Sequence, residues 1–319
     1  MRREKMSIGS LTVNECSLQG DALLAHAAGE RIYLNGALGS NGNSGKFKGE
    51  PIASLLQAQR MLRSGYNDII YFQASTGGIA LGAAFDWDDN LAHLVGVWPG
   101  YCEHARCILG MSTTFTPFMT VSGYGNSFSN IYTTHGTAAG DYVGWLISGA
   151  RNNFRNVHFG GPFFAAQADH ANYRGVNITA TENVFDGCIF GDTSITRDAA
   201  NYNVSLAAGV TAHFKNCLFR MYVDGANSMF VNFANTAGIT LAYFENCTFL
   251  ALSANLATTI DEALHFDGGS TALAVLDSDC NFIKVTKIAH ADKDQYVYLA
   301  RPHVTTTVNE GQIAEVLVS

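Results

Sequence analysis

The strongest candidates for chemistry in this 319-residue sequence are three carboxylates in four positions, within "FDWDDN" at 85–90. Asp86, Asp88 and Asp89 could supply the acid and the base that cleave a glycosidic bond, or oxygen ligands for Ca²⁺. A solvated turn between two strands explains the same residues without chemistry, and we prefer that interpretation. The sequence predicts no catalytic residue, no metal site and no cofactor elsewhere.

The stretch "CEHARC" offers metal ligands in Cys102, His104 and Cys107. Structural zinc sites take four ligands, usually from two regularly spaced pairs of cysteine or histidine. Here the spacing is irregular and no second pair follows. The pattern therefore indicates free thiols in a loop.

Two adjacent aromatic residues, Phe163 and Phe164, stand in "GGPFFAAQ" at 160–167. Neighbouring side chains point in different directions, so one of the two rings is exposed unless a partner covers it. We treat this pair as a candidate interface.

A repeat defines the elements that must position these residues. Residues 212–219 read "AHFKNCLF" and residues 242–249 read "AYFENCTF", and looser copies of the frame Phe-x-Asn-Cys-x-Phe extend in both directions. The copies begin at Leu94, Phe128, Phe154, Phe185, Phe214, Phe244 and Asp277, with spacings of 34, 26, 31, 29, 30 and 33 residues. A period that drifts in length is typical of one stacked unit per copy, with insertions in loops.

Side-chain parity within the frame requires a bend. Phe214 and Cys217 have opposite parity, so one straight strand cannot bury both. Asn216 lies between them, and asparagine and glycine adopt left-handed backbone angles readily. The same position holds Asn130, Asn156, Gly187, Asn216 and Asn246. Each repeat is therefore a strand, a one-residue turn, a second strand and a longer return with a third strand.

Stacked copies of this unit form an all-β, right-handed parallel β-helix. The stack places Phe154, Phe185, Phe214 and Phe244 inside, Asn156, Asn216 and Asn246 in one turn ladder, and Cys188, Cys217, Cys247 and Cys280 as buried, unpaired thiols. Outside, Asp186, Lys215 and Glu245 form a line that is either a charge ladder or part of a glycosidase site. His158 and His213 fall at outward-facing positions.

The segment "IYLNGALGSNGNSGKFKGEPIASLLQAQRMLRSGYNDIIYF" at 32–72 resembles the start of pectate-lyase-like β-helix proteins. There a strand, a Gly- and Asn-rich loop and a short helix precede the first coil, which "DNLAHLVGVWPG" at 89–100 resembles in turn. The resemblance is closest to β-helix proteins of tailed-bacteriophage virions, of capsid decoration or tailspike type. It implies a capping helix at about 51–64 and covers roughly residues 32–285. The family's Asn-Thr-Asp, Asp-Asp and Gly-His-Gly polygalacturonase set is missing.

Three segments follow from these patterns. We expect an N-terminal arm at 1–31, the β-helix at 32–285, and a C-terminal β segment at 286–319 that caps the stack or mediates oligomerisation. In the last segment "QYVYLA", "HVTTTV" and "IAEVLV" are typical of short strands.

Composition excludes several classes. The net charge of −8 and the absence of a basic cluster argue against nucleic acid as a partner. The first 15 residues contain no apolar core of a secretory signal, and no apolar run of about 20 residues predicts insertion into a membrane. Charged residues make up 14% of the chain, against about 25% in ordinary soluble domains.

Two classes of function remain open. The first is a non-enzymatic virion protein, a capsid decoration or cement protein on the head of a tailed phage. It would be made in the host cytoplasm, form a homotrimer and bind the major capsid protein. The second is a carbohydrate-active β-helix, either a tailspike-like or free polysaccharide-degrading enzyme, or an adhesin that binds a host-surface glycan.

Overall fold

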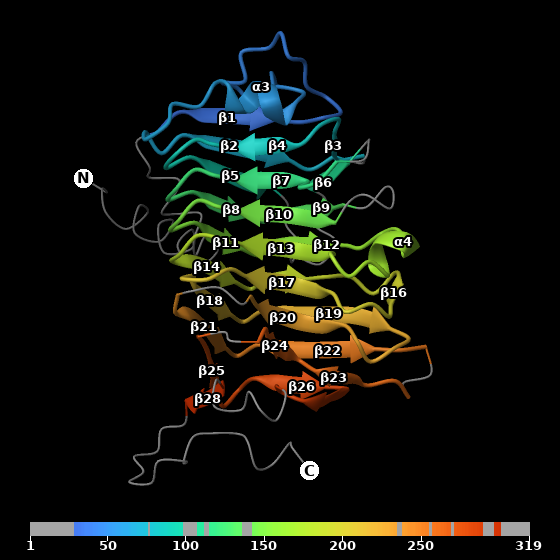
Figure 1. The fold of residues 1–319 in the computed structure, drawn as a ribbon. Coiled ribbons are helices and arrows are strands. Elements are labelled where there is room, and N and C mark those ends of the chain that lie inside the picture. Colours follow the sequence, from blue (N-terminus) through green and yellow to red (C-terminus); the bar gives the residue numbers. More distant parts are fainter. Residues whose placement is uncertain are drawn as a thin grey trace, which may run out of the picture.

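The computed structural model describes residues 29–75, 77–97, 107–111, 115–135, 142–234, 238–254, 257–268, 271–289 and 297–300. Over these residues the chain is a right-handed parallel β-helix, as the repeat predicts, with coils stacked along one axis (Figure 1). Predictions that concern residues 1–28, Cys102, His104 and residues 301–319 lie outside the described part. No helix among the described residues has the length and apolar character needed to span a bilayer.

Most described strands belong to three parallel sheets, which we name A, B and C in the order in which a coil visits them. Sheet A contains β1 (Arg31–Leu34), β2 (Ile69–Gln73), β5 (His93–Val97), β8 (Ser127–Ser129), β11 (Asn153–Arg155), β14 (Asn183–Asp186), β18 (Thr211–Lys215), β21 (Thr240–Glu245), β25 (Ala272–Asp277) and β28 (Val297–Ala300). Because β28 pairs with β25, the stack continues past residue 285.

Sheet B contains β3 (Ile79–Leu81), β6 (Ile108–Met111), β9 (Tyr132–Thr134), β12 (His158–Gly160), β15 (Ile189–Phe190), β19 (Leu218–Val223), β22 (Thr248–Leu252), β26 (Asn281–Ile283) and, beside β19, β16 (Thr196–Arg197). Sheet C contains β4 (Phe85–Trp87), β7 (Met119–Val121), β10 (Val143–Ile147), β13 (Arg174–Ile178), β17 (Tyr202–Leu206), β20 (Met229–Phe233) and β24 (Leu264–Phe266). A short pair, β23 (Ile260–Glu262) and β27 (Val285–Lys287), lies beside them.

Two phenylalanine stacks fill the interior. Consecutive rings of Phe154, Phe185, Phe214 and Phe244 on sheet A lie 4.9–5.0 Å apart and nearly parallel. Those of Phe159, Phe190, Phe219 and Phe249 on sheet B lie 4.7–5.1 Å apart. Rings of the two stacks meet edge to face, for example Phe190 and Phe214 at 5.7 Å. Both stacks are buried, so each coil adds two rings to one continuous core.

The turn between sheets A and B follows the predicted ladder. Asn156, Asn216 and Asn246 have φ values of 50°, 53° and 49°, and Gly187 has 64°. The Asn246 amide donates to Asn216 Oδ1 at 2.9 Å, and the Asn216 amide donates to Asp186 Oδ1 at 3.0 Å because Gly187 offers no side chain. Left-handed backbone and side-chain pairing together explain why this position takes Asn or Gly.

A second, buried asparagine ladder lies at the start of sheet A strands, and the sequence patterns did not predict it. The side-chain oxygen of Asn126 accepts the Ala92 backbone N–H, that of Asn152 accepts the Asn126 N–H, and that of Asn183 accepts the Asn152 N–H, each at 2.9 Å. These amides satisfy backbone groups where the chain turns from sheet C into sheet A.

The predicted capping helix at 51–64 is much shorter, α3 (Leu55–Gln59), although it covers the end of the stack (Figure 1). Ile52 cannot join the helix because it forms a parallel bridge with Leu34. Ser54 then caps the helix, accepting the Gln57 N–H at 3.3 Å. Beyond the helix, the Arg63 N–H donates to the Asp68 carboxylate at 2.8 Å instead of to a helix carbonyl.

Asp68, next to the capping helix, should make the stability of the protein sensitive to acid. Burial raises the pKa of Asp68. Hydrogen bonds from the Arg63 side chain and from the Glu30 and Arg63 backbone lower it by more, so the pKa lies below its usual value. A carboxyl group with a depressed folded pKa stabilises the protein above its unfolded pKa of about 3.9, and that stability is lost as pH falls through the folded value.

We therefore expect Asp68→Asn to lower the urea midpoint at pH 7 and to leave little difference from the unaltered protein near pH 2. The exposed Asp224→Asn is the matched control and should change neither midpoint. Equal pH profiles for the unaltered protein and Asp68→Asn would show that the Asp68 contacts add nothing.

Candidate functional site

The predicted acidic cluster lies at the N-terminal part of sheet C. Asp86 is exposed on β4 between buried Phe85 and Trp87, and its Oδ1 accepts the Ser122 hydroxyl at 2.7 Å. Asp88 Oδ1 accepts the Gln59 amide at 3.0 Å, and the same amide donates to the Asp86 carbonyl at 2.8 Å. The cluster is thus tied to the end of α3. Trp87 is fully buried in the core and presents no ring to a sugar.

The carboxylates of this acidic cluster differ in environment. Burial, followed by the nearby charge of Asp88, raises the pKa of Asp89. A raised carboxyl pKa is a shift in the direction that a general acid needs. Among the described residues, however, no three His, Cys, Asp or Glu side chains come together as a metal site would require.

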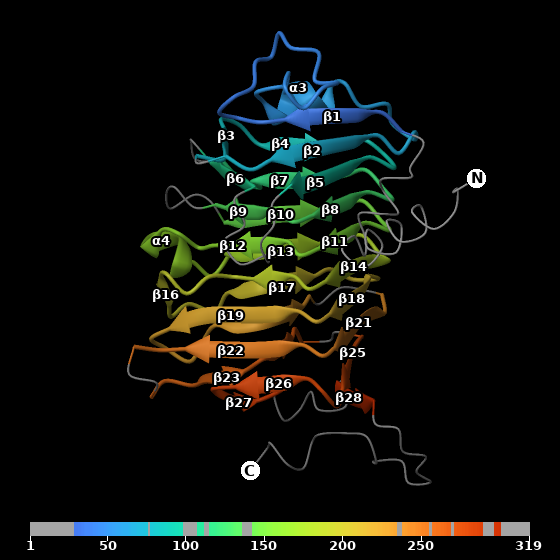
Figure 2. The same cartoon turned by 180° about the vertical axis from the view of Figure 1, so that it is seen from behind.

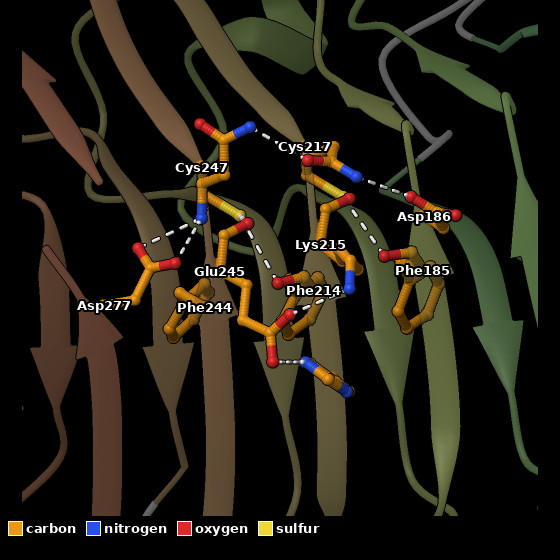
Figure 3. Close-up of polar contacts among 12 residues, drawn as sticks. Phe185, Asp186, Phe214, Lys215, Cys217, Phe244, Glu245, Cys247 and Asp277 are labelled. Atoms are coloured by element: carbon orange, nitrogen blue, oxygen red, sulfur yellow. Dashed lines mark hydrogen bonds and ion pairs between the residues drawn. The ribbon is translucent and has the colours of Figure 1, made fainter. Parts of the chain in front are cut away.

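The predicted outer row on sheet A is a paired charge ladder (Figure 3). Asp186, Lys215 and Glu245 occupy register positions on neighbouring strands. Lys215 Nζ lies 3.2 Å from Glu245 Oε2, and His213 Nε2 lies 3.0 Å from Glu245 Oε1. The hydrogen bond and charge of Lys215 lower the pKa of Glu245, together with the nearby His213. A carboxylate held ionised by a lysine and a histidine does not serve as a general acid at neutral pH.

A cysteine column runs beside the asparagine turns. Each thiol donates to the carbonyl of the sheet A phenylalanine one coil earlier, Cys188 to Phe154, Cys217 to Phe185 and Cys247 to Phe214, at 3.3–3.5 Å. Figure 3 shows the last two contacts. Cys107 occupies the same column, donating to the Phe72 carbonyl at 3.1 Å, so it is a buried core residue and not the loop thiol that the sequence suggested. The predicted copy that begins at Leu94 is confirmed in sheet A, where Leu94 pairs with Phe128, but its cysteine position is Cys107 and not Val97, because residues 98–106 intervene.

The prediction that all four repeat cysteines are buried is wrong for Cys280, which is half-buried. It lies in the last coil that contributes a described strand to sheet B, and no further described strand covers it.

The reactivity of these cysteine thiols should reflect their burial in the column. Burial raises the pKa of Cys217, and the Cys217 contact together with burial raises that of Cys247, so both hold little reactive thiolate. We expect a maleimide reagent to leave Cys188, Cys217 and Cys247 unmodified in the folded protein and to modify all three in denaturant, as read by peptide mass mapping. Rapid native modification of the three would contradict the packed column.

The two aromatic residues predicted as an interface lie in an excursion from the stack. Phe164 is exposed and precedes the short helix α4 (Ala165–Ala168), while Phe163 is half-buried and its N–H donates to Gln167 Oε1 at 3.3 Å. Both views show α4 and β16 projecting from the side of the coils (Figure 1, Figure 2). The pair thus presents one fully exposed ring, that of Phe164.

Beneath this excursion lies a buried polar cluster, which the sequence patterns missed. Arg197 is fully buried, donates to Asn203 Oδ1 at 2.6 Å and to the Gly161 carbonyl at 2.9 Å, and lies 5.0 Å from the centre of the Tyr173 ring. Burial lowers the pKa of Arg197, against the opposing effects of Tyr173 and Asp192.

The same cluster continues onto sheet B. His158 was predicted to face solvent, but it is buried, because Tyr132 stacks on its ring at 4.5 Å and Arg220 reaches to 3.4 Å from its Nε2. Arg220 comes from two coils later, and its NH2 also lies 3.9 Å from Asp192 Oδ2. Gly191 lies level with Arg220 on the preceding coil. It has φ 89°, and a Cβ there would overlap the Arg220 carbonyl. The cluster therefore fastens the connections from sheet B to sheet C onto the stack.

An exposed apolar surface covers the C-terminal strands of sheet A. Alternation turns Ala242 and Phe244 inward, so their neighbours on β21, β25 and β28 point outward. The sheet A strip, as we name it, consists of Ile239, Leu241, Tyr243, Leu273, Val275 and Tyr298. Ile239, Tyr243 and Tyr298 are 77%, 39% and 47% exposed. Contiguous outward apolar residues of this kind mark contact surfaces.

No protein-family model matches the sequence, and no curated protein matches it. Among solved structures, the chain is similar to the pectin methylesterase from Aspergillus niger, with 12% identity, a TM-score of 0.47, and coverage of 89% of this chain and 94% of that one. It is also similar to the pectin methylesterase PemA from Erwinia chrysanthemi (11%, TM-score 0.46, 86% and 91%) and to a rhamnogalacturonan lyase (12%, TM-score 0.45, 79% and 74%). At such identities the likeness concerns the fold alone.

Proposed function

We propose that the protein is a non-enzymatic virion protein that decorates the outer surface of a tailed-phage head as a homotrimer bound to the major capsid protein. The observation that carries the protein-binding part is the sheet A strip, an apolar surface on a rigid stack. The virion part rests on the resemblance of the repeat and of residues 32–72 to phage β-helix proteins. The proposed location is the capsid surface, after synthesis in the host cytoplasm.

The sheet A strip is suited to contact between copies. Its strands are held in register by the interior stacks, so the outward side chains form a fixed surface that needs no ordering on binding. Lys215 and Glu245 flank Tyr243 and are paired with each other, which leaves the apolar residues as the main driving force for association.

The test of self-association is the mass in solution. We expect a trimer for the unaltered protein and a monomer with an unchanged circular dichroism spectrum for Tyr243→Glu. Tyr124→Glu, at an exposed tyrosine outside the strip, is the matched control and should remain trimeric. A monomeric unaltered protein would overturn the homotrimer.

The test of particle binding is co-sedimentation with empty capsids of the phage whose genome encodes the chain. We assign this binding to the arm predicted at 1–31. Deletion of residues 1–28, which keeps Glu30 and β1 (Arg31–Leu34), should abolish co-sedimentation while the β-helix remains folded. Failure of the full chain to sediment with capsids would overturn the decoration role.

A second candidate, a polysaccharide-degrading enzyme, is favoured by one observation, the raised pKa of Asp89 beside Asp88. It predicts cleavage of an acidic polysaccharide such as polygalacturonate, loss of cleavage in Asp89→Asn, and retention in the exposed Asp279→Asn. Cleavage with this dependence would replace the structural proposal. A host-surface glycan that is bound but not cut would indicate the adhesin alternative.

A further inference from the structure

The charge of the described residues is divided unevenly along the stack. Residues 29–66, at the end that α3 covers, contain two acidic residues, Glu30 and Glu50, and five basic ones, Arg31, Lys46, Lys48, Arg60 and Arg63, for a net charge of +3. The other described residues contain 8 Lys and Arg against 16 Asp and Glu, for a net charge of −8. The capped end is therefore positive on an otherwise negative stack.

Residues 46–49, which read "KFKG", form the tip of a tight turn at this end. The Gly45 N–H donates to the Glu50 carbonyl at 3.1 Å, and the Glu50 N–H donates to the Phe47 carbonyl at 2.9 Å. The turn is also tied to the first strand, because the Tyr33 N–H donates to the Gly45 carbonyl at 2.7 Å. Phe47 is 65% exposed at this tip, with a lysine on either side.

A second turn, directly after β1, holds Leu38 in solvent. The side-chain oxygen of Asn35 accepts the N–H groups of Ala37 and Leu38, both at 3.0 Å, and the Gly39 N–H donates to the Asn35 carbonyl at 2.9 Å. Leu38 is 81% exposed. Both turns are thus fixed by hydrogen bonds, so their apolar side chains can bind a partner with little loss of backbone freedom.

The outer side of α3 continues this surface. Leu55 and Ala58 face the stack, whereas Leu56 is 49% exposed and Arg60, four residues later, is exposed on the same side. Asn41 Oδ1 accepts the Ser54 N–H at 3.0 Å, so the loop between β1 and α3 lies against the start of the helix. Both views show this loop reaching beyond α3 at the end of the stack (Figure 1, Figure 2). We name the exposed residues of this end the cap surface: Leu38, Lys46, Phe47, Lys48, Leu56 and Arg60.

The composition of the cap surface favours a lipid partner over a protein. Large apolar side chains among basic ones are typical of segments that lie in the interface of an anionic bilayer. Protein interfaces are enriched in arginine and depleted of lysine, but here lysines flank the ring at the tip. An ammonium group needs no planar partner, which suits a fluid layer of phosphate headgroups. Lys46 lies 3.3 Å from Glu30, but this exposed pair competes only weakly.

We propose that the cap surface binds an anionic lipid bilayer from outside. Phe47 and Leu38 enter the boundary between headgroups and acyl chains, and Leu56 contacts the same layer. Lys46, Lys48 and Arg60 contact the headgroup phosphates. The stack then stands away from the bilayer, which keeps its negative coils clear of the negative headgroups.

Co-sedimentation with unilamellar vesicles tests this binding. We expect the full chain to bind vesicles of phosphatidylcholine mixed with phosphatidylglycerol, to bind less as salt rises, and to leave vesicles of phosphatidylcholine alone unbound. Phe47→Ser should weaken binding at least about tenfold, the factor expected for an aromatic side chain that no longer leaves water. Lys46→Gln combined with Lys48→Gln should weaken it by a similar factor, about tenfold.

Phe164→Ser and Lys284→Gln are the matched controls, since they change an exposed phenylalanine and an exposed lysine outside the cap surface. Both should bind as the unaltered protein does. All variants change exposed side chains, so their circular dichroism spectra should be native.

Equal binding by Phe47→Ser and the unaltered protein would overturn the proposal, because the contact would then lie elsewhere in the chain. Absence of binding to the anionic vesicles would overturn it too, and binding to poly-L-glutamate in that case would indicate an acidic protein surface as the partner. Phe47→Ser should still form trimers and sediment with capsids, so failure here leaves those tests unaffected.

Discussion

Replacing Phe214 with alanine is expected to lower the free energy of unfolding by about 3–5 kcal/mol, the range for removing a buried phenylalanine. Phe214 is fully buried, stacks on Phe185 and Phe244 at 5.0 Å, and meets Phe219 edge to face. Its neighbours cannot collapse into the gap, because their backbones are fixed by the ladder on both sides. Urea unfolding followed by circular dichroism gives the value.

The matched control is Phe47→Ala, at a ring that is 65% exposed in the loop before α3. It should change stability by less than about 0.5 kcal/mol. If the two substitutions cost the same, the stacked rings do not supply the core energy that the fold requires.

Replacing Arg197 with methionine is expected to cost about 2–5 kcal/mol, because it leaves two buried acceptors, Asn203 Oδ1 and the Gly161 carbonyl, without a donor. Loss of the contact with Tyr173 adds to this cost. The excursion that carries α4 should then detach before the coils unfold, which limited proteolysis within 161–173 would detect.

Arg151→Met removes an exposed arginine that pairs with Glu182, and it serves as the control. Its unfolding midpoint and proteolysis pattern should match those of the unaltered protein. An Arg197→Met protein with native stability and native resistance to protease would show that the buried cluster is not what holds the excursion.

The repeat made the interior predictable. The repeated frame Phe-x-Asn-Cys-x-Phe predicts which side chains point into the core on each side of the turn. It also predicts the residue type in the turn. Cys107 escaped because the residues from 98 to 106 separate it from Gly96, the position that aligns with the turn residue Asn130. Alignment by spacing alone fails where a turn carries an insertion.

The buried cluster beside the excursion was not predictable in the same way. His158 and Arg220 stand at positions that alternation assigns to solvent, but Tyr132 and Arg220 cover His158, and the connection after β15 contacts both residues through Gly191 and Asp192. A repeat of about 30 residues does not predict which connection between sheets B and C packs against the stack. Gly160 and Gly161, which follow His158 in sequence, and Gly191, which lies level with Arg220 on the preceding coil, were the sequence signal of close packing at this place.

In five successive coils, two residues join the sheet A strand to the sheet B strand, and this regularity bears on how such a protein can change over generations. Because neighbouring coils of the repeat meet through equivalent phenylalanine, turn and cysteine positions, an in-frame duplication or deletion of one whole coil would keep the main stacking contacts of its neighbours. Residues 212–219 and 242–249 agree at five of eight positions, a similarity that such a duplication would leave. Recombination could thus alter the length of the molecule in steps of one coil while its two ends, and whatever they bind, are inherited unchanged.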